Sequence, residues 1–305
     1  QYNGIKLCRV GAAPVGQDTG LREIKQMIRD GIPAYDGPLG SVREQDMLRG
    51  YADFLLGLVD IRGIRPLKVV VDAGNGMGGH TVPVVLEGLP LEIIPMYFEL
   101  DGTFPHHEAN PIDPANLRDL QAAVIKHGAD IGLAFDGITS AAVPELIVEH
   151  GGTPVRTRVG HSFIKQRMAE TGAVFGGEHS GHFYFRDFWN ADSGMLAALH
   201  TLAALGETAA GTTLSQLLAP YERYVMSGEI NSTVTDAKAK VDAVRAAFAD
   251  RTTIDELDGV TFQGEGWWFN LRSSNTEPLL RLNVEAATAA GVQSLVDEVL
   301  SIVRG

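Results

Sequence analysis

Apolar residues recur along this chain in two periods, one of a strand and one of a helix. Leu67–Asp72 is a short β-branched run typical of a buried strand, whereas residues 46–60 carry apolar residues at helical spacing. The spacing predicts further strands at residues 91–96, 130–135, 154–158, 173–175 and 183–185, and helices at residues 81–87, 114–127, 141–149, 162–171 and 193–204. Strands that alternate with helices favour parallel sheets with covered faces, so we expect two α/β domains of similar layout.

The pattern changes after Pro220. Strands at residues 228–234, 259–263, 266–271 and 279–284 and helices at residues 237–249 and 291–303 predict an α+β domain. Residues 1–45 are rich in Gly, Pro and charge, and apart from one helix near residues 21–29 they offer too little apolar surface for a core. The chain is therefore expected to be a multi-domain α/β protein. We divide it into a remnant of a first domain at residues 1–45, two similar mixed or parallel-sheet α/β domains at residues 46–137 and 138–223, and a C-terminal α+β domain at residues 224–305.

The balance of basic and acidic residues limits the kinds of partner that the protein is expected to bind. With 25 basic and 38 acidic residues the net charge is -13, which argues against binding to a nucleic-acid backbone. No apolar run has the length of a membrane span and no signal peptide opens the chain, so no membrane partner is expected. Cys8 is the single cysteine, which excludes an internal disulfide framework and fits a reducing, cytoplasmic location.

The strongest candidate for chemistry is the segment Arg272–Pro278, which reads Arg-Ser-Ser-Asn-Thr-Glu-Pro between two expected strands. A guanidinium, hydroxyls, an amide and backbone N–H groups in one loop suit the several oxygens of a phosphate. The alternative is a polar turn that Pro278 ends, and the residue chemistry alone leaves both open.

A second candidate, Gly176–His182, follows an expected strand. Its glycines allow close backbone approach to a ligand, and Glu178 and Ser180 could pair with vicinal sugar hydroxyls. Glu178 with His179 and His182 also has the composition of a metal cluster, although further ligands are not obvious nearby. A glycine turn with exposed polar residues is the plain alternative.

Glycines also follow the strand at residues 67–72. Gly74, Gly76 and Gly79 have the spacing of a dinucleotide-binding fingerprint, and Glu99 lies at about the distance of a ribose-binding acid. This is the basis for a rival, nicotinamide-dependent function. A lone match is weak because glycines also serve tight turns, so we favour the structural interpretation.

Two further segments place polar residues at element ends. Asp136 follows a strand, at the edge where α/β sheets bind ligands, and its carboxylate could hold Mg²⁺ or belong to a solvated turn. Gly160 and His161 open a helix whose N-terminus favours anions; His161 is either an acid/base group or an ordinary surface histidine. The histidines in Phe104–Glu108 are interpreted as part of a proline-bounded loop rather than as metal ligands.

Taken together, these segments resemble the α-D-phosphohexomutase family, especially its bacterial phosphomannomutase/phosphoglucomutase members. The residues that carry the resemblance are Asn3–Lys6, Gly74–Gly76, Phe104–Pro111, Gly177–His182 and Arg272–Pro278. The resemblance implies four domains around a cleft and an enzyme whose phosphoserine interconverts hexose 6-phosphate and hexose 1-phosphate through a 1,6-bisphosphate. It also implies Mg²⁺ as cofactor, catalytic hexose 1,6-bisphosphate as activator, hexose phosphates as partners, and a monomer or homodimer.

The resemblance also implies roles for particular residues. It makes residues 46–137 the metal-binding domain, residues 138–223 the sugar-binding domain and residues 224–305 the phosphate-binding domain. The implied site residues are Lys6 and His161 as catalytic contacts, Gly160, Glu178, Ser180, Arg272, Ser274, Asn275 and Thr276 as substrate ligands, and Asp136 as metal ligand.

The chain departs from the family pattern at two places. The active-serine motif, Thr-Ala-Ser-His-Asn-Pro, is expected before Gln1 and does not occur in the sequence. The metal loop, Asp-Gly-Asp-x-Asp-Arg, is reduced to Asp136-Gly137-Ile138. We expect that consecutive numbers hide a missing segment at Gly137–Ile138. If the shortening is real, the alternative is a catalytically inactive protein that binds sugar phosphates.

Overall fold

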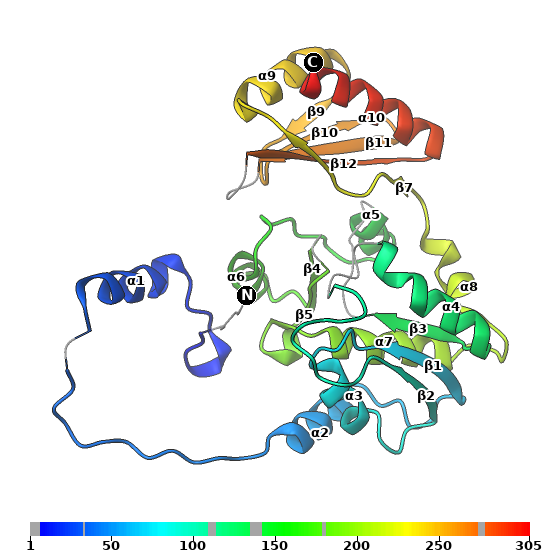
Figure 1. Ribbon diagram of the computed structural model, residues 1–305. Helices are drawn as coiled ribbons and strands as arrows, with labels where there is room; N and C mark the ends of the chain where they lie inside the picture. The colour runs from blue at the N-terminus through cyan, green and yellow to red at the C-terminus, as the bar shows by residue number, and fades with distance from the viewer. Residues whose placement is uncertain (1–6, 33, 109–113, 135–141, 179–180, 274–277) are drawn as a thin grey trace. The chain divides into compact units, whose positions relative to one another are not determined.

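The computed structural model describes residues 7–32, 34–108, 114–134, 142–178, 181–273 and 278–305 (Figure 1). The chain divides into two compact units. Unit 1 consists of residues 1–137 and 164–214, and unit 2 consists of residues 138–163 and 215–305. Each unit therefore contains two separate stretches of the sequence.

Unit 1 contains the parallel sheet that the sequence predicts. Its strands are β1 (Leu67–Asp72), β2 (Leu91–Met96) and β3 (Ile131–Ala134), in the order β2-β1-β3. Helix α4 (Arg118–His127) packs closely on β3, because the side chains of Leu120 and Val124 occupy the space where a Cβ on Gly132 would lie. Central β1 is buried almost throughout, as expected for a β-branched run between two strands.

The longest helix of unit 1 is α7 (Gly194–Gly206), which is apolar on most of its surface. Seven of its residues are buried, and the Ser193 hydroxyl caps it by accepting a hydrogen bond from Leu196 N at 3.1 Å. A helix that is hydrophobic nearly all round belongs inside a core. The other helices of unit 1 are η1 (Val10–Ala12), η2 (Gln17–Thr19), α1 (Leu21–Asp30), α2 (Leu48–Leu58), α3 (Gly78–Val85), η3 (Pro114–Leu117) and η4 (Arg186–Phe188).

A second, small sheet of unit 1 is antiparallel. Its strands are β4 (Phe175–Gly177), β5 (Phe183–Phe185) and β6 (Ala191–Asp192), in the order β4-β5-β6. Helix α6 (His161–Thr171), whose first residues belong to unit 2, contributes Ile164 and Met168 to its core around Tyr184.

The strand expected at residues 154–158 is wrong, because this segment has no strand assignment. It belongs to unit 2, whereas β4 and β5 belong to unit 1. One of its side chains makes an electrostatic contact instead: the Arg156 guanidinium forms an ion pair with the Asp255 carboxylate. Alternation of residue types predicts an extended chain, but only a partner strand makes it part of a sheet.

Unit 2 is built on an antiparallel sheet covered on one face by two helices (Figure 1). The strands are β7 (Val225–Met226), β8 (Ile230–Thr233), β9 (Thr253–Asp255), β10 (Val260–Gly264), β11 (Trp267–Ser273) and β12 (Leu279–Ala286). They follow the order β7-β12-β11-β10-β9, and β8 also pairs with β12. The helices of this unit are α5 (Ala142–Glu149), α8 (Leu214–Leu218), η5 (Ala219–Tyr221), α9 (Ala237–Phe248), η6 (Ala249–Arg251) and α10 (Ala289–Arg304).

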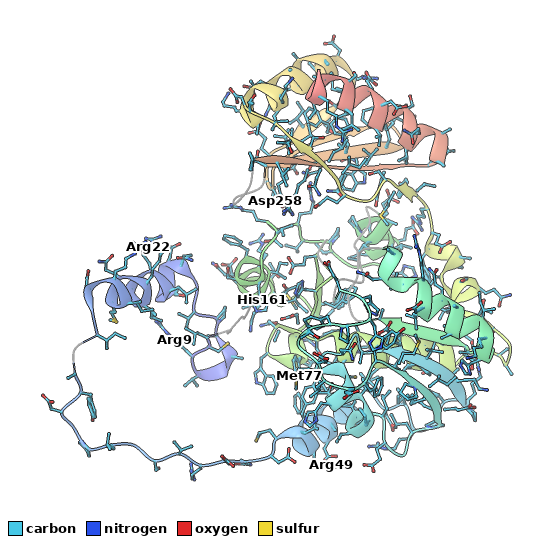
Figure 2. All side chains as sticks on the ribbon, viewed as in Figure 1. Arg9, Arg22, Arg49, Met77, His161 and Asp258 are labelled. Atoms are coloured by element: carbon cyan, nitrogen blue, oxygen red, sulfur yellow. The ribbon has the colours of Figure 1, made fainter. Side chains whose placement is uncertain are left out.

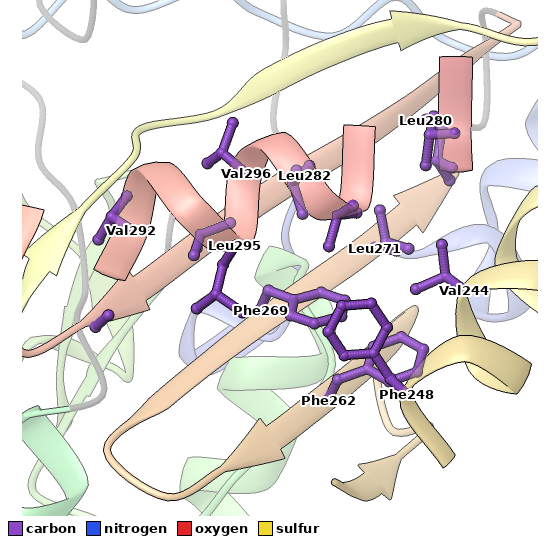
Figure 3. Close-up of a cluster of buried hydrophobic side chains, with 14 of the residues drawn as sticks. Val244, Phe248, Phe262, Phe269, Leu271, Leu280, Leu282, Val292, Leu295 and Val296 are labelled. Atoms are coloured by element: carbon purple, nitrogen blue, oxygen red, sulfur yellow. The ribbon is translucent and has the colours of Figure 1, made fainter. Parts of the chain in front are cut away.

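The core of unit 2 lies between this sheet and helices α9 and α10 (Figure 3). Phe262 and Phe269 stack at 4.6 Å between ring centroids, and Phe248 meets Phe269 edge-on at 4.9 Å. All three rings are fully buried, so each contributes several kcal/mol, about 3–5 on the scale of Phe→Ala substitutions. This core fixes β11 and β12, the strands on either side of the predicted phosphate loop.

Candidate active site

A cavity of about 600 Å³ lies at the carboxyl edge of the parallel sheet in unit 1. Its wall includes Asp72 at the end of β1, Ala134 at the end of β3, and His182 and Asp192 from the small sheet. The first turn of α7 closes another side through Gly194. Open α/β sheets bind ligands at this edge, so the cavity is where the sequence predicts a site.

Asp72 is nearly buried and is held from two directions. Its Oδ1 accepts a hydrogen bond from Gly74 N at 2.8 Å, and its Oδ2 lies 2.9 Å from His107 Nε2. The other ring nitrogen of His107, Nδ1, lies 2.9 Å from the Glu108 carbonyl oxygen. Both partners of His107 are acceptors, which favours a doubly protonated imidazolium. Burial lowers the pKa of His107, but the Glu108 carbonyl and the Asp72 carboxylate outweigh it, and the pKa is raised.

A polar network extends this wall away from the sheet. Asn75 has a left-handed backbone (φ 59°), and its side chain bonds the Glu99 carbonyl and His106 Nδ1. Tyr97 stacks on His106 at 3.9 Å, and its hydroxyl donates to Asp119 at 2.8 Å. That hydrogen bond raises the pKa of Tyr97 to about 12. The sequence interpretation of residues 104–108 as a plain loop missed this packing. The signal available was two adjacent histidines beside Gly74–Asn75.

The glycines at positions 74, 76 and 79 serve the turn and its contacts. Backbone N–H groups of Gly74, Asn75, Gly76 and Gly79 donate to Asp72 Oδ1, Tyr97 O, Ala73 O and Gly76 O. A Cβ on Gly79 would lie 2.0 Å from the Phe98 carbonyl oxygen, so that position admits only glycine. With these four donors already satisfied within the protein, the turn lacks the anion cradle of a dinucleotide site. The geometry therefore favours the structural interpretation.

Glu178 lies at the end of β4 with its side chain only 6% exposed. Its Oε1 accepts a hydrogen bond from the Tyr184 hydroxyl at 2.5 Å and lies 3.3 Å from His182 Nδ1. His182 Nε2 in turn lies 4.0 Å from Asp192 Oδ2. The small sheet thus places the Glu178 carboxylate next to the His182 imidazole, and that imidazole near the Asp192 carboxylate. His182 and Asp192 also line the cavity.

Of these, sequence reasoning proposed Glu178 as a sugar ligand and missed the roles of Tyr184 and Asp192. The signal for His182 was its spacing of four residues from Glu178 across a glycine turn, with Gly181 at φ 81°. No such signal existed for Asp192, because it approaches His182 only through the pairing of β6 with β5.

Gly160 and His161 belong to unit 2 and open helix α6; Figure 2 labels His161 there. Gly160 has φ 132°, a backbone conformation that requires glycine, and its carbonyl accepts a hydrogen bond from Phe163 N at 3.0 Å. The Arg158 guanidinium lies 4.8 Å from the centre of the Phe163 ring. This turn presents a cation and the first residues of a helix together, an arrangement that favours anions.

Arg272 lies near the end of β11 in unit 2 and is the first residue of the predicted phosphate loop. Its Nη1 is 3.6 Å from Asp258 Oδ2, and Figure 2 labels Asp258. The Asp258 carbonyl accepts a hydrogen bond from Asn270 Nδ2 at 2.9 Å. Gly259 makes this approach possible, because a Cβ there would lie 2.5 Å from the Leu271 carbonyl oxygen. A tight turn thus holds a carboxylate beside Arg272.

A second arginine, missed by sequence reasoning, lies opposite the first. Arg281 on β12 is the register partner of Arg272 on β11, and its Nη1 is 3.6 Å from Glu229 Oε1. Like charges directly opposite on antiparallel strands are destabilising, unless an anion offsets them. The signal was the alternation along β12, which places residues 279, 281 and 283 on one face.

Several predicted site residues lie outside the described residues. These are Lys6, Asp136, Ser180, Ser274, Asn275 and Thr276. Among the described site residues, Glu178 belongs to unit 1, whereas Gly160, His161 and Arg272 belong to unit 2. Within the described ranges no group of three His, Cys, Asp or Glu side chains has the geometry of a metal site. The same part of the chain holds no helix of the length and apolarity required to span a bilayer.

Family models match most of the chain. The models for phosphoglucomutase/phosphomannomutase α/β/α domain II, α/β/α domain III and C-terminal domain match residues 49–139, 118–224 and 229–302. Phosphomannomutase of Salmonella typhimurium strain LT2 is 36% identical over 93% of this chain and 73% of its own length. The chain belongs to the phosphoglucomutase/phosphomannomutase family.

Further relatives and solved structures agree with this membership. An enzyme named phosphohexose mutases from Xanthomonas campestris pv. campestris is 37% identical over 100% of this chain and 77% of its own length. A Burkholderia thailandensis phosphoglucomutase/phosphomannomutase family protein has a TM-score of 0.80 at 28% identity, over 95% of this chain and 70% of that one. The fold is also that of a putative phosphomannomutase from Thermus thermophilus, with a TM-score of 0.74 at 18% identity over 97% and 74% of the two chains. This phosphohexomutase is therefore a multi-domain α/β enzyme, as the sequence predicts.

The expectation of a segment hidden between Gly137 and Ile138 stays a prediction, because it concerns the numbering of this junction itself. The alignment with the Xanthomonas relative spans 348 positions, whereas this chain has 305 residues, so that phosphohexomutase carries stretches that this one lacks. The domain II and domain III models also overlap at residues 118–139. Relative to that protein, the family member described here is thus shorter within the aligned region.

Proposed function

We propose that this chain interconverts hexose 6-phosphates and hexose 1-phosphates of mannose, glucose or both. The observation that carries this proposal is Glu178, a nearly buried carboxylate whose contact residue His182 lines a cavity of about 600 Å³, in a member of the phosphoglucomutase/phosphomannomutase family. A carboxylate can accept hydrogen bonds from two neighbouring hydroxyls of a sugar ring. The same carboxylate can bind these hydroxyls whether the hexose carries its phosphate at position 1 or at position 6.

The reaction implied by the family resemblance uses a phosphoserine. Its phosphoryl group passes to the free hydroxyl of a hexose monophosphate, whose proton leaves to a base, and a 1,6-bisphosphate results. After reorientation, the other phosphoryl group returns to the serine. The motif that carries this serine does not occur in the present sequence, so the transfer step is proposed for a protein that also contains that motif. The 1,6-bisphosphate would act as activator by restoring the phosphoserine.

The proposed ligands divide by the part of the substrate that they hold. Glu178 and Ser180 would accept and donate hydrogen bonds with the 3- and 4-hydroxyls. The phosphate that is not transferred would be bound by Arg272, Ser274, Asn275 and Thr276, and we add Arg281 because it is the register partner of Arg272. Gly160, His161 and Lys6 would complete the substrate contacts.

We assign Mg²⁺ to Asp136, which comes two positions after the last residue of β3 in the sequence. One carboxylate fits Mg²⁺ in the manner that the ion often adopts, with water and substrate phosphate oxygens as its remaining ligands. When bound, the ion would neutralise charge on the transferring phosphoryl group. Asp72 is not a second ligand in this proposal, because both of its oxygens already accept hydrogen bonds.

Domain roles follow from these assignments. Residues 46–137 would form the metal-binding domain, residues 138–223 the sugar-binding domain and residues 224–305 the phosphate-binding domain, with residues 1–45 as part of a first domain. We propose a cytoplasmic location and a monomer or homodimer.

The test is coupled turnover of mannose 1-phosphate and of glucose 1-phosphate by the protein that also contains the active-serine motif, with Mg²⁺ and trace hexose 1,6-bisphosphate. We expect formation of the 6-phosphate from at least one of the two sugars, and loss of that activity in Asp136→Asn. Formation of 6-phosphate at equal rates by wild type and Asp136→Asn would contradict the metal assignment. Absence of turnover together with absence of hexose phosphate binding would contradict the proposed function.

A second candidate is a protein that binds hexose phosphates without turning them over. The junction Asp136-Gly137-Ile138 favours it, because the family resemblance implies two further aspartates and an arginine there. Titration calorimetry with mannose 1-phosphate, run beside the turnover assay, separates the candidates. Binding without turnover supports the second candidate, and binding with turnover supports the first.

A further inference from the structure

Tyr184 occupies the centre of the small sheet in unit 1. Its side chain is fully buried, and it packs with Ile164 and Met168 of helix α6. Gly176 lies beside it on β4 in a tight place, since a Cβ there would lie 3.0 Å from Met168 Sδ and 3.5 Å from Tyr184 Cβ. A ring packed this closely has one position, and its buried hydroxyl requires a hydrogen-bond partner.

The partner of the Tyr184 hydroxyl is Glu178 Oε1, at 2.5 Å. Burial, and then the hydrogen bond to Glu178, raise the pKa of Tyr184, so its hydroxyl stays protonated and donates this bond. Glu178 itself is nearly buried, and a carboxylate removed from water is costly unless hydrogen bonds compensate it. The phenol thus supplies a donor where the carboxylate needs one.

The two carboxylate oxygens of Glu178 differ in their polar contacts. Oε1 meets both the Tyr184 hydroxyl and His182 Nδ1, at 2.5 and 3.3 Å. Across the described residues, no hydrogen bond reaches Oε2. A donor on a rigid ring therefore selects one rotamer of the carboxylate and leaves the second oxygen for a ligand.

We propose that Tyr184 is a positioning residue for the sugar site: its hydroxyl fixes Glu178 so that Oε2 is available to a sugar hydroxyl and Oε1 orients His182 toward the cavity. This inference rests on the proposed function, which assigns Glu178 to the sugar. Tyr184 itself would touch neither substrate nor reacting atoms, because its side chain has no exposed surface. Its effect is confined to the sugar end of the ligand.

The experiment is titration calorimetry on the dephosphorylated full chain, without bisphosphate, so that ligand binds and does not turn over. Tyr184→Phe is expected to weaken mannose 1-phosphate binding about fivefold, the effect of one hydrogen bond, and to leave inorganic phosphate binding unchanged. Tyr224→Phe is the matched control, because it removes another tyrosine hydroxyl bonded to a glutamate, Glu145, at 2.6 Å in unit 2. It is expected to change neither affinity.

A double-mutant cycle with Glu178→Gln separates positioning from packing. If Tyr184 acts through Glu178, Tyr184→Phe costs little further affinity in the Glu178→Gln background. If Tyr184→Phe proves too unstable to assay, 4-aminophenylalanine and 4-methylphenylalanine at position 184 replace it. Both have about the volume of tyrosine, but only the amino form donates a hydrogen bond, so it alone is expected to retain wild-type affinity.

Equal mannose 1-phosphate affinity in wild type and Tyr184→Phe, or a fivefold loss that persists in full in the Glu178→Gln background, would overturn the inference. The proposed function fails by a different result, namely a folded wild-type protein that binds no hexose phosphate. In that case the inference, which depends on that function, falls with it.

Discussion

The two regions proposed to hold a hexose phosphate are built in different ways. Glu178 in unit 1 is 6% exposed and is fixed by a buried tyrosine and a histidine. Arg272 and Arg281 in unit 2 have side chains 29% and 30% exposed, and each faces a carboxylate at 3.6 Å. Glu178 is thus held in one geometry by hydrogen bonds. Arg272 and Arg281 are a pair of charges that remain in contact with water.

The difference follows from the ligand chemistry that we propose. Hydroxyl groups of a sugar are recognised by direction, so their acceptor must be oriented before the ligand arrives. A phosphate carries charge on several equivalent oxygens, so two arginines can bind it in more than one arrangement. The arginine pair also explains why the flanking carboxylates are present, since Asp258 and Glu229 offset the repulsion between the cations while the site is empty.

The largest expected effect is that of Arg272→Ala. Loss of a charged, hydrogen-bonded contact is worth about 1.5–3 kcal/mol, so we expect a rise of about 100-fold in the KM for hexose 1-phosphate and in the Kd for inorganic phosphate. Arg251→Ala is the control, because Arg251 forms an ion pair with Glu298 in which both side chains are partly exposed. An unchanged KM would remove the phosphate role from this loop.

Glu178→Gln is expected to have a smaller and more selective effect. The amide keeps the size of the side chain and loses one acceptor and the charge, so hexose 1-phosphate binding should weaken about 30-fold. Inorganic phosphate binding should not change, because that ligand has no ring hydroxyls. Calorimetry with both ligands checks this, and an equal loss for both would show that the two regions are not specialised as proposed.

Ionic strength should affect binding at the arginine pair more than binding at Glu178. Partly exposed charges are screened by salt, so raising NaCl from about 50 to 500 mM should weaken inorganic phosphate binding by roughly fivefold. The ratio between wild-type and Glu178→Gln affinities for hexose 1-phosphate should stay the same, because a buried hydrogen bond is screened much less. A ratio that falls with salt as steeply as phosphate binding would argue that Glu178 acts as a charge.

The smallest expected effect concerns pH and unit 1. The pKa of His107 is raised above its ordinary value, so its stabilising contribution is complete at pH values below about 6.5 and is lost as pH rises through the folded-state pKa. The titratable groups that face it are Asp72, Asp119 and Tyr97. Urea unfolding should therefore give a lower midpoint at pH 8 than at pH 6. The arginines of unit 2 do not titrate in this range.

His107→Gln supplies the control for that comparison. Without a titrating imidazole on Asp72, the variant should be less stable at pH 6 and should lose less stability between pH 6 and pH 8 than the wild type. Equal pH dependence in both proteins would place the titrating group elsewhere.

Much of the fold was predictable from local pattern. The strands at residues 67–72 and 91–96 were expected with the bounds that β1 and β2 have, because a β-branched run between turn residues has few alternatives. The helix expected at residues 193–204 is α7, which begins one residue later and ends two residues later. The short strands β6, β7 and β9 were not predicted, because they lack the run of aromatic residues that marks β5, a strand of similar length that was expected at residues 183–185.

The candidate site was predictable in its types of residue and not in its contacts. Glu178 and Arg272 could be named from their motifs, because a carboxylate in a glycine turn and an arginine beside hydroxyls have recognisable chemistry. Tyr184, Asp192 and Arg281 could not, since each reaches its partner through strand pairing or register. His107 was visible in the sequence, but its bond to Asp72 joins residues 35 positions apart.

By itself the sequence determined the periods of its strands and helices, the places of its turns, and the functional groups that each loop carries. Those properties are local, because a few neighbouring residues suffice to bias the backbone and to set its chemistry. Only the tertiary structure decided that Asp72 holds a histidine rather than a ligand, that Tyr184 supports Glu178, and that two arginines lie opposite each other. Such pairings depend on which strands meet and in what register, and the core packing of the whole unit selects them.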